Sequence, residues 1–317
     1  MTTVWVPCDA AARAVGADEV ADAFAAAGAT VRRNGSRGML WLEPLVEVET
    51  DAGRIGYAAV RPQYAGDILA GNHVDLGVVE DHPWLADQHR VTFARVGRHE
   101  PTDLAAYRSD GGYAGLERAL TLDPADVVAE VTTSGLRGRG GAGFPTGIKW
   151  ETVRKAASDL KFVCCNADEG DSGTFADRML LEGDPFSLLE GMTIAAYAVG
   201  ASEGYVYVRS EYPDAIATLR RAIDVARAGG LLGRHIAGRE GFTFDLQVRV
   251  GAGAYICGEE TSMLDSLEGK RGEVRAKPPI PALVGLFGQP TVVNNVLSLA
   301  TVPMILADGG QAYAALG

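Results

Sequence analysis

The spacing of apolar residues near the N-terminus predicts a small α/β unit. The predicted elements are a strand at Val4–Val6, a helix at Ala17–Ala27, and a hairpin formed by Met39–Val48 and Arg54–Val60 that turns at Asp51-Ala52-Gly53. A polar, irregular stretch follows, and Pro101 and Asp110-Gly111-Gly112 mark a boundary near residues 100–115. We therefore expect a first domain over residues 1–110.

Helical and strand patterns alternate through the remaining residues, 111–317. Asp123-Pro124 opens a helix through about Val131, with Asp123 as the cap and Pro124 in the first turn. Further helices are expected at Gly147–Ala157, Pro185–Val199, Pro213–Ala228 and from Glu259, and strands at Lys161–Cys165, Tyr205–Arg209 and Phe242–Val250. This alternation predicts an α/β sandwich.

Charge and composition narrow the class of protein. The net charge of −12 provides no basic field for phosphate backbones, so we expect no nucleic-acid partner. The N-terminus lacks the basic and apolar regions of a secretory signal, and no window approaches 18 uninterrupted apolar residues. We expect a cytoplasmic protein with no membrane span.

Cysteine and histidine spacing argues against a metal site. The four cysteines are Cys8, Cys164, Cys165 and Cys257, and no CxxC is present. Four of the five histidines lie between His73 and His99 at spacings that fit no compact metal motif. We predict neither a disulfide framework, nor a cysteine-ligated cluster, nor any other metal site in this chain.

A glycine-rich run, RGRGGAGFPTGIKW, covers Arg137–Trp150 and contains a GxGxxG match. The match follows a predicted helix and a Ser-Gly turn, not a strand, so it fails the structural test of a dinucleotide Rossmann fingerprint. Five glycines within residues 135–143 still allow backbone N–H groups to approach a planar or anionic ligand. Thr146 is expected to cap the following helix, whose N-terminus favours negative charge.

Three later blocks occur in order with this run: Cys165-Asn166-Ala167-Asp168-Glu169, then residues 251–261 (GAGAYICGEET), then Lys277-Pro278-Pro279 through Asn294-Asn295. Together the four blocks closely resemble the NADH-binding flavoprotein subunit of respiratory complex I and the diaphorase subunits of NAD-reducing hydrogenases and formate dehydrogenases. The resemblance spans about residues 115–317. It implies a Rossmann-like α/β domain, not a true dinucleotide Rossmann fold, that binds FMN and NAD(H).

The resemblance also implies which residues touch each cofactor. The glycine loop lies along FMN, and the cofactor-binding residues are Gly138, Arg139, Gly140, Gly141, Ala142, Gly143, Lys149, Asn166, Asp168, Glu169, Tyr255, Gly258, Glu259, Glu260, Thr261, Asn294 and Asn295. The NAD(H)-binding residues are Phe144, Glu169, Asp171 and Glu260, and Glu169 and Glu260 are the candidate catalytic residues. Tyr255 could equally be a core residue or a wall against the flavin. Hydride transfer itself needs no general acid, because the flavin does the chemistry.

Three positions depart from the family pattern. Phe144 matches an aromatic that stacks on the adenine of NADH, but the other two aromatic positions of that clamp are here Thr152 and Ile280. Asp171 stands where related chains often have Glu. Because two of the three clamp positions lack an aromatic ring, the adenine of NADH is expected to bind more weakly or in a different arrangement.

Both ends of the chain differ from the family pattern: the C-terminal end is expected to reflect a truncated portion or a fragment of a longer subunit, and the N-terminal unit indicates a subfamily. Family members continue into a ubiquitin-like domain and a [4Fe–4S] domain, whereas this sequence stops at Gly317 and holds no ligands for that cluster. The stretch Gly35–Pro44 has no cysteine where thioredoxin-like [2Fe–2S] proteins hold theirs. A thioredoxin-like domain without its cluster, fused to the flavin domain, resembles the beta subunit of soluble molybdenum-dependent NAD-linked formate dehydrogenases.

This subfamily implies two partners: a small [2Fe–2S] thioredoxin-like subunit and a larger subunit with iron–sulfur clusters and molybdenum. The alternatives are a diaphorase subunit of an NAD-reducing hydrogenase, a flavoprotein subunit of an NADH:quinone oxidoreductase, or a noncatalytic docking scaffold.

Overall fold

A computed structural model describes residues 1–316, which divide into two compact units. The first unit comprises residues 1–106 and 182–184, and the second comprises residues 107–181 and the chain from Pro185 onward. None of the helices within the described residues is long and apolar enough to cross a bilayer.

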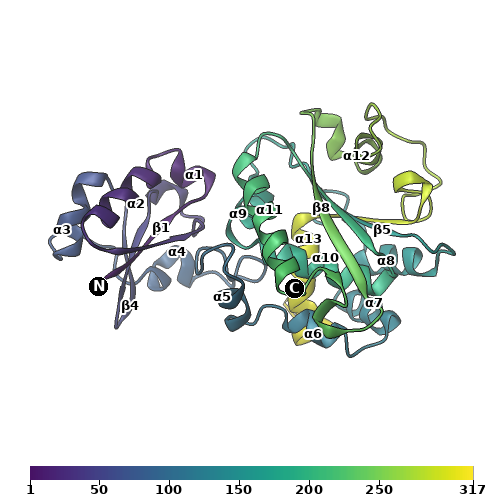
Figure 1. Cartoon of the computed structure of the whole chain (residues 1–317), viewed down its shortest axis with the longest axis horizontal. Helices are drawn as coiled ribbons and strands as arrows, with labels where there is room; N and C mark the ends of the chain where they lie inside the picture. The colour runs from purple at the N-terminus through teal and green to yellow at the C-terminus, as the bar shows by residue number, and fades with distance from the viewer. Residues whose placement is uncertain (317) are drawn as a thin grey trace. The chain divides into compact units, whose positions relative to one another are not determined.

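The first unit, whose strands β1 and β4 are labelled in Figure 1, is built on a four-stranded sheet. The strand order is β2-β1-β3-β4. Strands β1 and β2 pair in parallel, and β3 runs antiparallel to both β1 and β4. Its elements are β1 (Thr3–Pro7), α1 (Ala10–Arg13), α2 (Ala17–Ala26), β2 (Thr30–Asn34), β3 (Val46–Thr50), β4 (Gly53–Tyr57), α3 (Ala65–Leu69) and α4 (Pro83–Ala86). Val4 and Val6 pack against Phe24 of α2 in its core.

The predicted hairpin has the expected turn, but its first strand begins at Val46 and not at Met39. Residues Leu40–Leu42 form a 3-10 turn instead. Pro44 has no N–H to donate to a ladder, which confines the strand to the residues beyond it. Strand β2 was not predicted, because its residues, TVRRN, are mostly polar and form the edge of the sheet. The thioredoxin-like assignment of this unit stays a prediction.

The second unit contains a five-stranded sheet with the order β7-β8-β6-β5-β9, in which β8, β6, β5 and β9 are parallel. Its strands are β5 (Phe162–Ala167), β6 (Glu203–Val208), β7 (Gly233–Arg234), β8 (Thr243–Val250) and β9 (Thr291–Asn295). Its helices are α6 (Ala114–Ala119), α7 (Pro124–Thr133), α8 (Thr146–Lys155), α9 (Ala176–Gly183), α10 (Pro185–Val199), α11 (Pro213–Ala228), α12 (Glu260–Leu267), α13 (Val296–Asp308) and α14 (Gly310–Ala314). Helix α5 (Leu104–Ser109) spans the junction of the two units along the chain.

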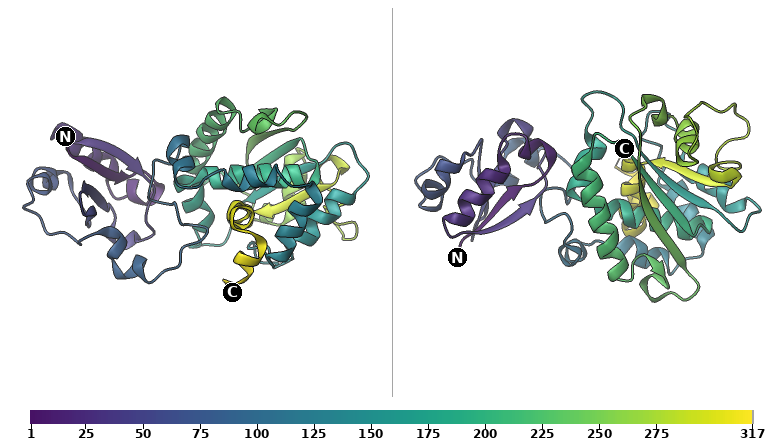
Figure 2. Two further views of the ribbon diagram at one scale, coloured as in Figure 1. Left: turned by 90° about the horizontal axis from the view of Figure 1, so that it is seen from below. Right: turned by 45° about the horizontal axis from the view of Figure 1, so that its top comes forward.

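Two layers cover this sheet, because successive side chains of a strand point to opposite faces. Phe162 and Cys164 of β5 pack with Met263 and Leu264 of α12 on one face. On the other face lie α10 and α13, which contact each other and β5 (Figure 2). The α/β fold class predicted from the sequence is thereby confirmed.

The order of the strands identifies where a ligand site is expected. The chain runs from β5 to β6 to β8 in one direction and then returns to place β9 on the other side of β5. In open parallel sheets, ligands bind outside the carboxyl ends of the strands at the point where the strand order reverses. That point is the β5–β9 pair.

Candidate functional site

A cavity of about 410 Å³ lies beside β9 in the second unit. This volume is in the range of small-molecule sites. Its walls come from the glycine loop, α8, the end of β5, the start of α12, the segment after α12, and β9. The lining residues are Gly138, Gly140, Ala142, Gly143, Phe144, Lys149, Thr152, Asn166, Gly258, Glu259, Glu260, Lys277, Ile280, Pro281, Ala282, Thr291, Val293, Asn294 and Asn295.

The glycine loop closes on itself between α7 and α8. The Gly138 N–H donates to the Phe144 carbonyl at 2.9 Å, and the Arg137 guanidinium donates to the Gly143 carbonyl at 2.9 Å. A Cβ at Gly140 would lie 3.2 Å from the Cβ of Asn295. A side chain at this position would crowd the end of β9, so glycine allows the loop to approach the sheet.

Helix α8 carries the next wall of the cavity. The prediction that Thr146 caps this helix is wrong: Pro145 occupies the N-cap position, and Thr146 is the first helical residue. The Thr146 hydroxyl is buried and makes no hydrogen bond within the described part of the chain. Trp150, fully buried on the same helix, donates its indole N–H to Asn294 Oδ1 at 3.0 Å, which joins α8 to β9.

A smaller correction applies to Asp123, which occupies the N-cap position of α7 as predicted but makes no side-chain capping hydrogen bond. Its backbone is extended, with φ −70° and ψ 148°, and Pro124 follows in the first turn. Proline is well suited to that position, because its fixed φ is already helical and its missing N–H would have no partner inside the helix. The helix therefore begins without help from the Asp123 carboxylate.

Amide side chains mark the carboxyl ends of the neighbouring strands β5 and β9. Asn166, on β5, donates to the Gly258 carbonyl at 2.8 Å and accepts from the Asp168 N–H at 3.1 Å. Asn295, at the end of β9, accepts from the Ser298 N–H at 3.1 Å and so caps α13. Both amides line the cavity, at the reversal point of the strand order.

Two lysines and two glutamates form a charged cluster in the cavity. Lys149 Nζ donates to the Val293 carbonyl at 2.7 Å and lies 3.5 Å from Glu260. Lys277 Nζ lies 3.0 Å from Glu259 and 2.7 Å from Glu260. Burial lowers the pKa of Lys149, and the nearby Glu260 carboxylate, which acts to raise that pKa, offsets the shift only in part. For Lys277, burial is outweighed by the two carboxylates, which raise its pKa.

Glu259 has a structural task beside its place in the wall. The helix predicted from Glu259 begins at Glu260, and Glu259 is its cap: one carboxylate oxygen accepts from the N–H groups of Thr261 and Ser262 at 2.8 and 3.0 Å. Burial raises the pKa of Glu259, but these hydrogen bonds and Lys277 outweigh it, so the pKa is lowered. The carboxylate therefore stays charged at the start of α12.

Seven predicted site residues do not line the cavity: Arg139, Gly141, Asp168, Glu169, Asp171, Tyr255 and Thr261. Arg139 turns toward the C-terminal helices, since its guanidinium donates to the Tyr313 hydroxyl at 2.7 Å and its N–H to Ser298 Oγ at 2.9 Å. Thr261 is buried in the first turn of α12, where its hydroxyl accepts from the Arg275 N–H at 2.9 Å.

The carboxylate of Glu169 is engaged in the loop after β5. It accepts from the N–H groups of Asp177 and Arg178, at 3.0 and 3.3 Å, and from the Tyr212 hydroxyl at 3.0 Å. These contacts hold the first turn of α9, a helix that the sequence pattern did not predict. Asp168, half-buried by its neighbours, has its pKa raised by that burial.

Tyr255 is 72% exposed, so of the two interpretations left open by the sequence it is not a core residue. Its hydroxyl donates to Asp171 Oδ1 at 3.1 Å, and its ring lies against Gly170, where a Cβ would approach it to 2.8 Å. Tyr255 and Asp171 are thus paired on the surface, outside the cavity lining.

Five lining residues had no role predicted from the sequence: Lys277, Pro281, Ala282, Thr291 and Val293. All belong to the fourth block, which was recognised as a motif, and strand β9 and helix α13 within and after it were not predicted. The basic residue Lys277, inside a block already recognised as a motif, was the available signal. The other four line the wall through apolar or hydroxyl groups that carry no such signal.

The arrangement fits a planar cofactor with an anionic tail. Glycines leave backbone exposed on one wall, amides from β5 and β9 offer donors and acceptors, and Lys149 and Lys277 supply positive charge. Phe144, Thr152 and Ile280, the three positions of the expected adenine clamp, all line the cavity. Among residues 1–316 no group of three or more His, Cys, Asp or Glu side chains is placed to hold a metal ion.

Comparisons with known proteins agree with this chemistry. Residues 131–304 match the family described as the Nuo51 FMN-binding domain. The NADP-reducing hydrogenase subunit HndC of Solidesulfovibrio fructosivorans is 50% identical over 230 residues, which cover 73% of this chain and 46% of that protein. A subunit of the NADH-quinone oxidoreductase of Escherichia coli (strain K12) is 49% identical over 229 residues, covering 72% of this chain and 51% of that protein.

A solved structure, that of an NAD+-reducing [NiFe]-hydrogenase in the air-oxidized state, matches with a TM-score of 0.57 and 31% sequence identity. The match covers 98% of this chain and 53% of the hydrogenase chain. The chain spans about half the length of the curated relatives it matches.

Proposed function

Because this chain belongs to the Nuo51-type FMN-binding family, we propose that its cavity binds FMN and admits NAD(H), between which hydride is exchanged. The observation that carries the proposal is the convergence of four separate sequence blocks on one cavity at the reversal point of a parallel sheet. FMN supplies the redox chemistry, and the chain supplies binding, alignment and electrostatics.

The proposed flavin contacts come from the loop and from the strand ends. Gly138, Gly140 and Ala142 offer a backbone surface for the ring, and Asn166, Asn294 and Asn295 offer polar groups for the ring edge and ribityl chain. Lys149 is the proposed cationic partner, because burial already weakens its preference for the charged form and an anionic ligand restores it.

Glu260 is the proposed carboxylate nearest the nicotinamide end. It lines the cavity and contacts both Lys149 and Lys277. A carboxylate held by two cations keeps its orientation and can accept hydrogen bonds from ribose hydroxyls. Glu169 does not line the cavity, so we propose that it acts through the loop after β5, whose conformation its carboxylate stabilises.

We propose, at a finer level, that the chain is the diaphorase part of a soluble NAD-linked formate dehydrogenase and works beside iron–sulfur and molybdenum subunits. The cysteine-free stretch Gly35–Pro44 supports this subfamily. Two alternatives share the same cavity chemistry: a hydrogenase diaphorase, as the relative HndC is named, and a flavoprotein subunit of an NADH-quinone oxidoreductase. Co-purified molybdenum favours the first, and nickel favours the hydrogenase.

One experiment tests the hydride chemistry. The full chain, purified and reconstituted with FMN, is expected to retain flavin absorbance through gel filtration and to reduce ferricyanide with NADH as donor. Boiled protein and free FMN at the same concentration serve as controls. Loss of all flavin on the column, together with a rate equal to free FMN, rejects the enzymatic proposal and favours the docking scaffold.

A further inference from the structure

The segment from Lys270 to Pro290, which we call the strap, forms one wall of the cavity with little regular structure of its own. Apart from one 3-10 turn at Leu286–Gly288, its residues form neither helix nor strand. It nevertheless places Lys277, Ile280, Pro281 and Ala282 on the cavity. A long irregular segment in an ordered wall needs contacts that hold it.

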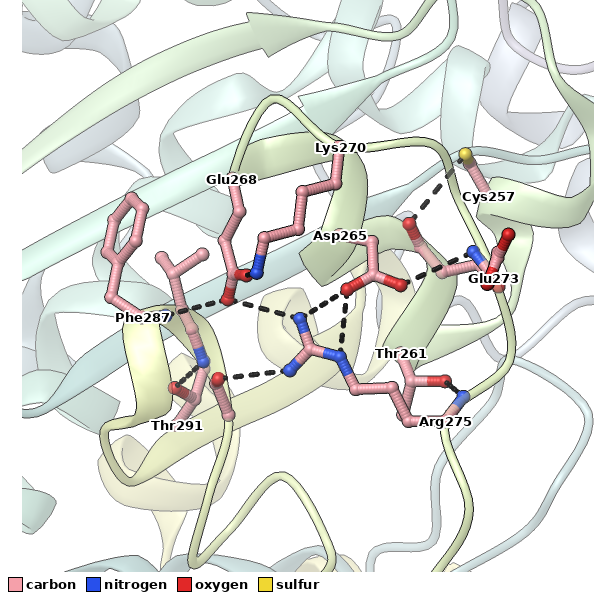
Figure 3. Close-up of polar contacts among 12 residues, drawn as sticks. Cys257, Thr261, Asp265, Glu268, Lys270, Glu273, Arg275, Phe287 and Thr291 are labelled. Atoms are coloured by element: carbon pink, nitrogen blue, oxygen red, sulfur yellow. Dashed lines mark hydrogen bonds and ion pairs between the residues drawn. The ribbon is translucent and has the colours of Figure 1, made fainter.

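Arg275 makes such contacts with α12, as Figure 3 shows. Its guanidinium lies 2.6 Å from Asp265 Oδ1 through Nη2, 2.9 Å from the same oxygen through Nε, and 3.1 Å from Glu268 Oε1. Its Nη1 donates to the Gly285 carbonyl at 3.2 Å. One side chain thus joins α12 to the start and the end of the strap.

Backbone groups of the strap use the same helix. The Glu273 N–H donates to Asp265 Oδ2 at 3.3 Å, and the Phe287 N–H donates to Glu268 Oε1 at 2.8 Å (Figure 3). Asp265 and Glu268 are largely buried, with side chains 11% and 7% exposed. Since buried carboxylates are costly without partners, these contacts are more than loose surface pairs.

The helix that binds Arg275 also begins with the glutamates of the cavity. Lys277 follows Arg275 by two residues and contacts Glu259, the cap of α12, and Glu260, its first residue. We propose that Arg275 is a positioning residue, which fastens the strap to α12 and thereby holds Lys277 against Glu259 and Glu260. The effect on nucleotide affinity rests on the proposed function, whereas the positioning of Lys277 does not.

Arginine suits this position because its guanidinium contacts three acceptors at once: Asp265, Glu268 and the Gly285 carbonyl. A guanidinium presents five N–H donors in a fixed fork, whereas a lysine ammonium is a point charge on a flexible stem. Arg275→Lys keeps the charge but cannot reach Asp265, Glu268 and the Gly285 carbonyl together. Arg275→Gln removes the charge as well.

The test uses the full chain without added cofactor and compares Arg275→Gln, Arg275→Lys and the control Arg271→Gln, an exposed arginine in the same strap. Acetic anhydride labels lysines, and mass spectrometry reads Lys277 against the exposed Lys155. We expect Lys277 to be labelled about tenfold faster in Arg275→Gln, the factor that corresponds to one hydrogen bond to a charged group. Arg275→Lys is expected to be intermediate, and Arg271→Gln to match the native chain.

Hydrogen exchange at Glu273 and Phe287 gives a second measurement, and both amides are expected to exchange faster in Arg275→Gln. With FMN bound, the KM for NADH is expected to rise about tenfold with little change in kcat.

If Arg275→Gln fails to fold, Glu268→Gln replaces it in the test, because an amide oxygen can still accept from the Phe287 N–H. Native labelling of Lys277 and native exchange in the folded variants overturn the proposal. A loosened strap with an unchanged KM rejects its extension to nucleotide affinity. A native chain that binds neither FMN nor NADH rejects the proposed function alone, because labelling still reports on Arg275.

Discussion

Individual side chains in the second unit combine a structural task with a place in the cavity wall or a contact to it. Glu259 caps α12 and lines the cavity, and Trp150 fills the core while its indole N–H fixes Asn294. A substitution at either position therefore changes the fold and the site together. Asp177, in contrast, is buried without lining the cavity, so its substitution tests a structural task alone.

Asp177 gives a pH-dependent prediction at this scale. Burial, and then the nearby Glu169 carboxylate, raise its pKa from 3.8 to about 8. Between about pH 4 and pH 8, Asp177 therefore keeps its proton in the folded chain but has lost it in the unfolded chain. Its contribution to the free energy of unfolding is fully present below about pH 4 and is lost as the pH rises through 8. We expect Asp177→Asn to flatten the fall in unfolding free energy over this window by up to about 1.4 kcal/mol per pH unit.

Urea titrations followed by circular dichroism from pH 5 to pH 8 measure this effect. Asp159→Asn, at an exposed position, is the matched control and is expected to keep the native slope. An Asp177→Asn slope equal to that of the native chain contradicts the prediction.

The sequence predicted residue roles best where a local motif was present. The glycines of the loop, Lys149 and the paired Asn294-Asn295 were all named in advance, and all but Gly141 among these line the cavity. Arg275 and Lys277 were not given roles, because their carboxylate partners lie 7 to 18 positions away, on α12 and at its two ends, and no periodicity reports such contacts. Glu169 was named, but its engagement by Asp177 and Tyr212 depends on tertiary packing that the motif does not encode.

At the scale of elements, the glycine loop and β9 act as a pair. Gly140 approaches Asn295 so closely that a Cβ would lie 3.2 Å from the Cβ of Asn295, tighter than most real contacts. Gly141 is a poorer site for substitution, because its φ of +105° strains any L-residue regardless of the ligand.

We therefore expect Gly140→Ala to displace Asn295 and to weaken FMN binding about tenfold, since overpacking of this kind costs roughly 1–3 kcal/mol. Flavin fluorescence titration measures the affinity. Gly229→Ala, at the exposed end of α11 where φ is −80°, serves as the control. Unchanged FMN affinity in Gly140→Ala would show that the loop does not bear on the flavin through Asn295.

Elements with strong patterns were predicted well, and those with weak patterns were missed. The helix at Pro213–Ala228 was predicted at its observed bounds because its apolar stripe is regular. Helix α9 was missed since it follows a polar loop, and its start depends on hydrogen bonds to Glu169. Strand β9 is a short buried run whose neighbour, β5, lies more than 120 residues earlier, and sequence alone cannot assign that pairing.

On the scale of the whole molecule, the cavity belongs entirely to the second unit. A ligand that binds only the folded state stabilises it by mass action, by about 2.7 kcal/mol at a free concentration about 100 times its Kd. We expect FMN to slow hydrogen exchange in β5 and β9 and to leave β1 and β3 unchanged. The same chain without FMN is the control, and equal protection of both sheets contradicts this expectation.

Helix α12 sets a limit on how this site can vary. Its first residue, Glu260, faces the cavity, while Asp265 and Glu268 bind Arg275 further along. Each residue of an α-helix turns the next by about 100°. One residue inserted or deleted between Glu260 and Asp265 would change the angle between Glu260 and the carboxylates of Asp265 and Glu268. With Glu260 facing the cavity, those carboxylates would then point away from Arg275. Point substitutions on the solvent side of α12 would leave this angle unchanged. Length, more than composition, is the constrained property of this helix.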